Sequence, residues 1–289
     1  MQGTLCKGIA GFYYVAAEDG NVYECKARGI FRKKGITPLP GDEVEISLLP
    51  EEGKASLDRI LPRKNAFDRP PVANVDLLAC VIAAKHPEPN LAVLDRLTAE
   101  AEGSGAEIII CVNKADLASE ALLEELRSAY EGVYPLYFIS AKKGEGIDAL
   151  KEAFSGKRCA LTGPSGVGKS TIANRMLGSG TAKTGEISEK LRRGKNTTRH
   201  SELFMAEGFA LFDTPGFTSF EMGQMDEALL DRRFPEFAPY IGKCRFNNCR
   251  HLKEPDCAVH AAVEAGNIHK SRYDSYVGIY AELKEKNTY

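Results

Sequence analysis

No apolar run in this 289-residue sequence reaches the ~18 to 20 residues that a membrane-spanning helix needs. The N-terminus, MQGTLCKGIAGFYYV, lacks a charged and then apolar leader with a small-residue cleavage site. The sequence also lacks a strong net charge, since 38 Lys and Arg stand against 40 Asp and Glu. These absences favour a cytoplasmic protein without a membrane partner and exclude one that coats nucleic acid by bulk charge. Any RNA contact must come from local basic patches.

The chain shows no internal repeat and no low-complexity tract, and its length predicts two or three domains at about 100 to 200 residues each. Residues 1–66 read as short β segments, with Asp19 and Gly20 at a hairpin turn, which is typical of a small OB-fold barrel. Residues 67–221 alternate apolar strands with helices and predict a mostly parallel sheet covered on both faces. Residues 222–289 have helical periodicity around a Cys/His cluster.

The segment GPSGVGKS follows a predicted strand and opens a predicted helix, as a phosphate loop requires. Its glycines let backbone N–H groups face the phosphates of a nucleoside triphosphate, and the start of the helix favours negative charge. Lys169 would supply a point charge between the β- and γ-phosphates, and Ser170 would bind Mg²⁺. The expected phosphate-loop residues are Gly163, Pro164, Ser165, Gly166, Val167, Gly168, Lys169, Ser170 and Thr171.

The choice of base falls to the segment NKAD, which ends the apolar run EIIICV. The Asp116 carboxylate can accept hydrogen bonds from N1–H and the 2-amino group of guanine, whereas adenine would leave it unpaired. Asn113 would bond the other edge of the base and bridge to the phosphate loop, and the stem of Lys114 would cover the ring. The segment SAK, Ser140, Ala141 and Lys142, follows the next strand, and ligands bind at the carboxyl ends of parallel strands.

The segment DTPG at a later strand end supplies the two remaining elements of a GTPase site. Asp213 would reach Mg²⁺, and the N–H of Gly216 would sense the γ-phosphate. Thr197 or Thr198 would complete the Mg²⁺ shell, and Thr198 is favoured. Phenylalanine follows Gly216 where many GTPases carry a water-orienting glutamine, so His200 is the candidate group for that role, although it could equally face solvent or RNA.

Three of the eight cysteines cluster with a histidine in CRFNNCRHLKEPDC, and the other five are scattered, mostly in apolar runs. A cytosolic setting favours metal binding or burial over disulfides. Cys244, Cys249, His251 and Cys257 form a Cys₃His set typical of a structural zinc site, in which no position remains for a catalytic water. His260 and His269 are expected at the surface. Basic side chains around the ligands suit RNA phosphates or a solvated rim: Lys243, Arg245, Arg250 and Lys253.

The order of the motifs is unusual, because NKAD and SAK precede the phosphate loop. A circular permutation explains this order and preserves the sheet and its site. Together with the barrel and the Cys₃His cluster, the arrangement closely resembles the RsgA (YjeQ/YloQ) family of small-ribosomal-subunit biogenesis GTPases over essentially the whole chain. One segment departs from it: the family typically has GRHTTTH where this chain has GKNTTRH, so Asn196 replaces a histidine and Arg199 a threonine.

The resemblance implies an OB-fold, a permuted GTPase domain and a zinc domain that dock on the small subunit, bind its rRNA and hydrolyse GTP to GDP late in its maturation, with stimulation by the ribosome. We expect a monomer with Mg²⁺ and one structural Zn²⁺. One alternative is a GTPase that regulates a non-ribosomal process such as cell-envelope metabolism. Another is a binding module in which the nucleotide is only structural. Asp116 disfavours an ATP-dependent kinase.

Overall fold

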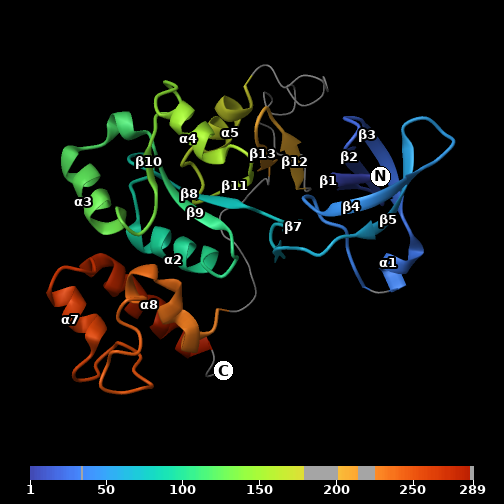
Figure 1. The fold of residues 1–289 in the computed structure, drawn as a ribbon. Helices are drawn as coiled ribbons and strands as arrows, with labels where there is room; N and C mark the ends of the chain where they lie inside the picture. Colours follow the sequence, from blue (N-terminus) through green and yellow to red (C-terminus); the bar gives the residue numbers. More distant parts are fainter. Residues whose placement is uncertain (34, 179–200, 214–224, 287–289) are drawn as a thin grey trace.

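The computed structural model of the chain describes residues 1–33, 35–178, 201–213 and 225–286. It contains an N-terminal β-barrel, a central sheet covered by helices, and a C-terminal, mostly helical part (Figure 1). The C-terminal part packs against the helices that cover one face of the central sheet. None of the described helices is long and apolar enough to cross a membrane.

The barrel has five strands in the order β1-β2-β3-β5-β4, and β4 pairs back to β1 to close it. This is the OB-fold predicted from the sequence, and the hairpin at Asp19 and Gly20 is confirmed between β2 and β3. Inward-facing apolar residues such as Leu5, Val15 and Leu57 are fully buried. The strands are β1 (Gln2–Ile9), β2 (Phe12–Ala17), β3 (Val22–Ala27), β4 (Glu43–Leu48) and β5 (Lys54–Ile60), with the short helix α1 (Gly29–Lys33) between β3 and β4.

The central sheet has the strand order β10-β9-β8-β11-β13-β12, in which all neighbours are parallel except β12 and β13. Every residue of β8 is buried, as expected for an apolar strand covered on both faces. The strands are β8 (Leu77–Ala83), β9 (Glu107–Asn113), β10 (Leu136–Phe138), β11 (Arg158–Thr162), β12 (Glu202–Met205) and β13 (Ala210–Asp213). A small hairpin that the sequence did not predict, β6 (Ala66–Phe67) with β7 (Val72–Ala73), precedes them.

Two pairs of helices cover the two faces of this sheet. Side chains of α2 (Leu91–Ala101) and α3 (Glu120–Tyr130) pack in one apolar core, and those of α4 (Ile147–Phe154) and α5 (Lys169–Leu177) pack in the other. The single-turn helix η1 (Ala115–Leu117) follows β9. The alternation of strands and helices predicted from the sequence is therefore confirmed.

The barrel and the central sheet meet edge to edge, because β1 pairs antiparallel with β12 at Lys7 and Glu202. The eleven described strands of the barrel and the central sheet therefore belong to one continuous sheet, and β6 and β7 form a separate hairpin. No sequence motif indicates this seam, which joins the barrel to β12, the antiparallel neighbour of the strand that ends in the DTPG segment.

The C-terminal part is held on the central domain by a fully buried arginine of its last helix. Its elements are η2 (Glu227–Arg233), η3 (Pro235–Phe237), α7 (Ala258–Glu264) and α8 (Lys270–Lys286), so the predicted helical tail begins with 3₁₀ turns rather than α-helix. Arg272 of α8 donates to Asp95 Oδ1 of α2 at 2.7 Å and to Glu236 Oε1 at 2.6 Å. Its guanidinium also lies 4.7 Å from the ring centroid of Phe234. A buried charge requires partners of this kind, so the network fixes α8 against α2.

Candidate nucleotide site and metal cluster

The phosphate loop lies between the end of β11 and the start of α5, at the edge of the sheet where the parallel strands end. Two of its positions accept only glycine. At Gly163 (φ +143°) an added Cβ would lie 2.0 Å from the carbonyl oxygen of Val81, and at Gly168 (φ +100°) it would lie 2.3 Å from Nδ2 of Asn113. The loop is therefore packed directly against the ends of β8 and β9.

Lys169, the first residue of α5, turns its side chain back over the loop. Its Nζ donates to the carbonyl oxygens of Gly163 at 2.6 Å and Pro164 at 2.9 Å. Burial lowers the pKa of the ammonium to about 8. The side chain is thus placed beside the loop that would cradle phosphates, while Ser170 and Thr171 lie exposed at the start of the same helix.

Asn113, at the end of β9, ties the base-reading segment to both other motifs. Its Nδ2 donates to the carbonyl oxygen of Val167 in the phosphate loop at 2.8 Å. Its Oδ1 accepts from the backbone N–H of Lys114 at 2.8 Å and of Ala141 at 3.0 Å. One buried side chain therefore connects NKAD, SAK and the phosphate loop, although they are far apart in sequence.

Lys114 and Asp116 occupy the turn after β9. Lys114 has φ +60°, and its Nζ donates to the carbonyl oxygens of Gly166, at 2.9 Å, and of His86. Asp116 Oδ2 lies 3.2 Å from Nζ of Lys143. The nearby Ser140 hydroxyl and the Lys143 ammonium lower the pKa of the Asp116 carboxyl, so it is ionised and able to accept hydrogen bonds at neutral pH.

Three residues of this site were missed by the sequence reasoning. Arg175 of α5 holds the SAK segment, donating to the carbonyl oxygens of Ala141 at 3.0 Å and Lys142 at 2.8 Å. Lys143 pairs with Asp116, and His86 contacts Lys114 through its backbone. Arg175 lies six residues beyond Lys169, but nothing in that spacing indicates a contact with SAK.

The last predicted elements are only partly within the described residues. Asp213 ends β13 and is half-buried, and burial, followed by the nearby charge of Glu202, raises the pKa of its carboxyl. Thr197, Thr198, His200 and Gly216 lie outside the described residues.

We expect Gly168→Ala to weaken GDP binding at least about tenfold, because the new Cβ displaces the Asn113 amide and adds backbone strain. Gly156→Ala is a matched control, since Gly156 also has a positive φ (+73°) but has no atom within 4 Å of an added Cβ. Thermal melting should report destabilisation of both variants, whereas a fluorescence titration with GDP should report weaker binding for Gly168→Ala only. Equal GDP affinities would contradict the packing argument.

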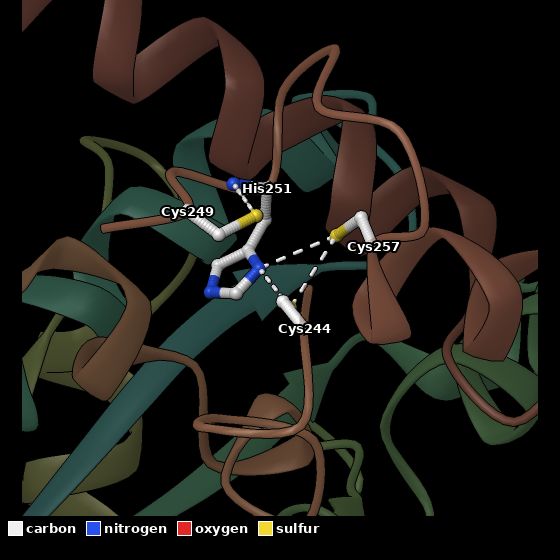
Figure 2. Close-up of side chains that lie close together, drawn as sticks. All are labelled: Cys244, Cys249, His251 and Cys257. Atoms are coloured by element: carbon white, nitrogen blue, oxygen red, sulfur yellow. Dashed lines mark hydrogen bonds between the residues drawn. The ribbon is translucent and has the colours of Figure 1, made fainter. Parts of the chain in front are cut away.

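Four potential metal ligands converge in the C-terminal part (Figure 2). The donor atoms of Cys244, Cys249, His251 and Cys257 all lie within 4.8 Å of one another. His251 Nδ1 is 3.5 Å from the Cys244 sulfur and 3.4 Å from the Cys257 sulfur, and these two sulfurs are 3.9 Å apart. In a tetrahedral zinc site, sulfurs lie about 3.8 Å apart and sulfur and nitrogen about 3.5 Å apart, so the cluster has the size and the donor set for zinc.

Residues outside the donor set hold this loop in place. The other ring nitrogen of His251, Nε2, lies 3.8 Å from Asp231 Oδ2 of η2. The hydroxyl of Tyr273 donates to the carbonyl oxygen of His251 at 2.9 Å, and that of Tyr276 donates to the carbonyl oxygen of Arg250 at 2.7 Å. Helix α8 therefore holds the loop that carries the four potential ligands, residues 243–257, which we call the metal loop.

His260 and His269, both expected at the surface, are each partly exposed. The His260 ring is half-buried, with Nε2 2.7 Å from the Tyr273 hydroxyl, because α7 turns this face toward α8. His269 is also half-buried, and its Nδ1 lies 2.8 Å from the hydroxyl of Ser271 at the start of α8. Neither belongs to the donor cluster. Of the basic rim, Arg245 pairs with Asp256 at 3.0 Å and Arg250 donates to the carbonyl oxygen of Ala228.

Base-reading segments that precede a phosphate loop along the chain, yet meet it at one edge of a parallel sheet, define a circularly permuted P-loop GTPase. The family model of the RsgA GTPase matches residues 60–223, and that of the RsgA N-terminal domain matches residues 2–56. The chain belongs to the RsgA GTPase family and is a GTP hydrolase that binds guanine nucleotides.

Individual relatives match over nearly the full length. The small ribosomal subunit biogenesis GTPases RsgA of Agathobacter rectalis and Clostridium acetobutylicum are each 44% identical to this chain, with 100% of both chains covered. Among solved structures, YjeQ from Thermotoga maritima has a TM-score of 0.84 at 34% identity, covering 98% of each chain. YloQ, described as a circularly permuted GTPase, has a TM-score of 0.83 at 34% identity and covers 99% of this chain and 95% of its own.

Proposed function

We propose that this protein hydrolyses GTP to GDP and phosphate in the cytoplasm during late maturation of the small ribosomal subunit, bound to its rRNA. The observation that carries the proposal is the permuted nucleotide site, in a chain whose full-length relatives are named small ribosomal subunit biogenesis GTPases. The comparisons offer no support for a role in cell-envelope metabolism. We also propose a division into a barrel (1–66), a GTPase domain (67–221) and a zinc domain (222–289).

In the proposed site, each described residue has one task. Asp116 accepts the hydrogen bonds of guanine, Lys114 covers the ring, and Asn113 holds the two segments together. Lys169 and the backbone N–H groups of the phosphate loop bind the phosphate oxygens and stabilise the charge that develops on them during attack by water.

Mg²⁺ fits the donor set at the phosphate-loop edge, where Ser170 offers a hydroxyl and Asp213 a carboxylate. When bound, Mg²⁺ would offset the charge of the β- and γ-phosphate oxygens. We further propose that Thr198 completes the Mg²⁺ shell, that the N–H of Gly216 contacts the γ-phosphate, and that His200 orients the attacking water. The Cys244, Cys249, His251 and Cys257 set would hold one structural Zn²⁺, and the protein would act as a monomer.

The proposed function predicts slow GTP turnover by the isolated protein and an increase of about tenfold or more on addition of purified small subunits, because Phe217 cannot orient water. Phosphate release is measured with the full chain alone, with small subunits and with large subunits. The large subunit is the control for non-specific stimulation by an RNA-rich particle. Equal rates under all three conditions would count against ribosomal stimulation and favour another partner.

A further inference from the structure

One row of side chains crosses the seam between the barrel and the central sheet. Lys7 of β1 lies opposite Glu202 of β12, and Glu202 lies opposite Asp213 of β13, both in antiparallel pairs. Directly opposed residues of neighbouring antiparallel strands project from the same face of a sheet. The strand register therefore places one ammonium and two carboxylates in a line that starts in the barrel and ends at Asp213.

Side-chain contacts connect the first members of this row. The Lys7 ammonium lies 3.2 Å from Glu202 Oε1, and the two side chains are only 25% and 20% exposed. The same ammonium lies 5.0 Å from the ring centroid of Tyr14, which is opposite Lys7 on β2. The Tyr14 hydroxyl in turn donates to Glu24 Oε2 of β3 at 3.0 Å. The row thus extends over three strands of the barrel, and its partial burial limits screening by salt.

The far end of the row lies beside the phosphate loop. Strand β13 runs parallel to β11 with Phe212 opposite Ala160, so Asp213 lies at the sheet edge where the phosphate loop begins. Glu202 carries a second carboxylate into this half-buried neighbourhood, and its charge acts on Asp213. Two neighbouring carboxylates strengthen the local attraction for a divalent cation, and a nearby ammonium weakens it.

We propose that Lys7 and Glu202 are positioning residues for the magnesium site: Glu202 adds negative charge beside Asp213, and Lys7, delivered by the barrel, offsets that charge. The proposal rests on the proposed role of Asp213 in Mg²⁺ binding. It makes the barrel part of the nucleotide site through an electrostatic contact across the seam.

The test measures release of a fluorescent GDP analogue from the full-length protein as a function of free Mg²⁺ concentration. Glu202→Gln removes one negative charge at nearly constant shape and should raise the half-saturating Mg²⁺ concentration about threefold. Lys7→Met exposes Asp213 to the uncompensated charge of Glu202 and should lower it about threefold. The double variant should lie close to the wild type, because the loss of the positive charge offsets the loss of the negative charge.

Two further variants serve as controls. Lys7→Arg keeps the charge and should match the wild type. Lys26→Met removes another barrel lysine, whose ammonium lies over the ring of Phe12 outside the row, and should also match it. Glu202→Gln tests the proposal even if Lys7→Met disturbs the seam, and thermal melting identifies such a disturbance.

The outcomes separate the two levels of inference. A wild-type protein whose GDP release does not depend on Mg²⁺ would overturn the proposed magnesium site itself. A wild type that does depend on Mg²⁺, combined with unchanged values in Glu202→Gln and Lys7→Met, would overturn the role of the row alone. Shifts of the same sign in the two single variants would also contradict it.

Discussion

Replacement of Asp116 by asparagine should weaken GDP binding about a hundredfold or more and make xanthosine diphosphate the better ligand. The ionised carboxylate can accept hydrogen bonds from both N1–H and the 2-amino group of guanine, and its pKa is held below the usual range by Ser140 and Lys143. Asparagine can accept a hydrogen bond from only one of these donors, because its amide NH₂ faces the other. That NH₂ and the guanine donor opposite it then both lack an acceptor in a desolvated site. Xanthine carries an oxygen at position 2, so the same NH₂ can donate to it.

Fluorescence titrations of Asp116→Asn with GDP and xanthosine diphosphate give the two affinities directly. Asp148→Asn is the matched control, because Asp148 is an exposed carboxylate in the first turn of α4 and belongs to no part of the proposed site. It should bind GDP as the wild type does. A variant at position 116 that loses both nucleotides equally would show that the substitution disturbs the turn after β9 instead of the reading of the base.

The parts of the site that the sequence predicts are those carried by short contiguous motifs. The glycines at 163 and 168 and the lysine at 169 specify a loop between a strand and a helix, and the positive φ of both glycines is a local requirement of that loop. NKAD follows an apolar strand, so its place at the edge of a parallel sheet follows from the alternation of strands and helices. The Cys₃His spacing is equally local.

What the sequence could not predict depends on how distant elements meet. Arg175 contacts the SAK segment, and Arg272 contacts Asp95 of α2, because of how the helices are placed in the fold. The periodic pattern of one helix does not indicate which element packs beside it. The pairing of Lys7 with Glu202 depends on the register of two strands that are separated by nearly the whole GTPase domain. The periodicity of apolar residues indicates which face of a strand is buried but not which strand lies beside it.

The buried contacts of Arg272 determine which part of the C-terminal region should unfold when the proposed metal is removed. Cys244, Cys249 and Cys257 lie on a loop segment with little regular structure, so the proposed metal would supply much of its folding free energy, on the order of 10 kcal/mol in zinc peptides. Helix α8 has a separate attachment, since Arg272 bonds Asp95 of α2 and Glu236. Chelation should therefore unfold the metal loop while α8 stays on the GTPase domain.

Amide hydrogen exchange before and after treatment with a strong chelator would measure this difference. Backbone amides of residues 243–257 should lose protection by at least about a hundredfold, and those of α8 around Arg272 should change by less than about tenfold. Cys257→Ser should reproduce the effect without chelator and should bind less zinc by elemental analysis. Cys6→Ser, a half-buried thiol in the barrel, is the control and should keep one zinc per chain.

A parallel loss of protection in α8 would mean that the metal, and not the arginine network, holds the C-terminal part on the GTPase domain. Arg272→Met separates these two attachments, because it removes the buried charge while leaving the four ligands intact. It leaves Asp95 without its cation in a buried position and should loosen α8 from α2 while zinc remains bound. We expect the chelated protein to lose protection in residues 243–257 and Arg272→Met to lose it in α8. These two results together would establish that the metal folds the loop and that the arginine holds the helix on α2.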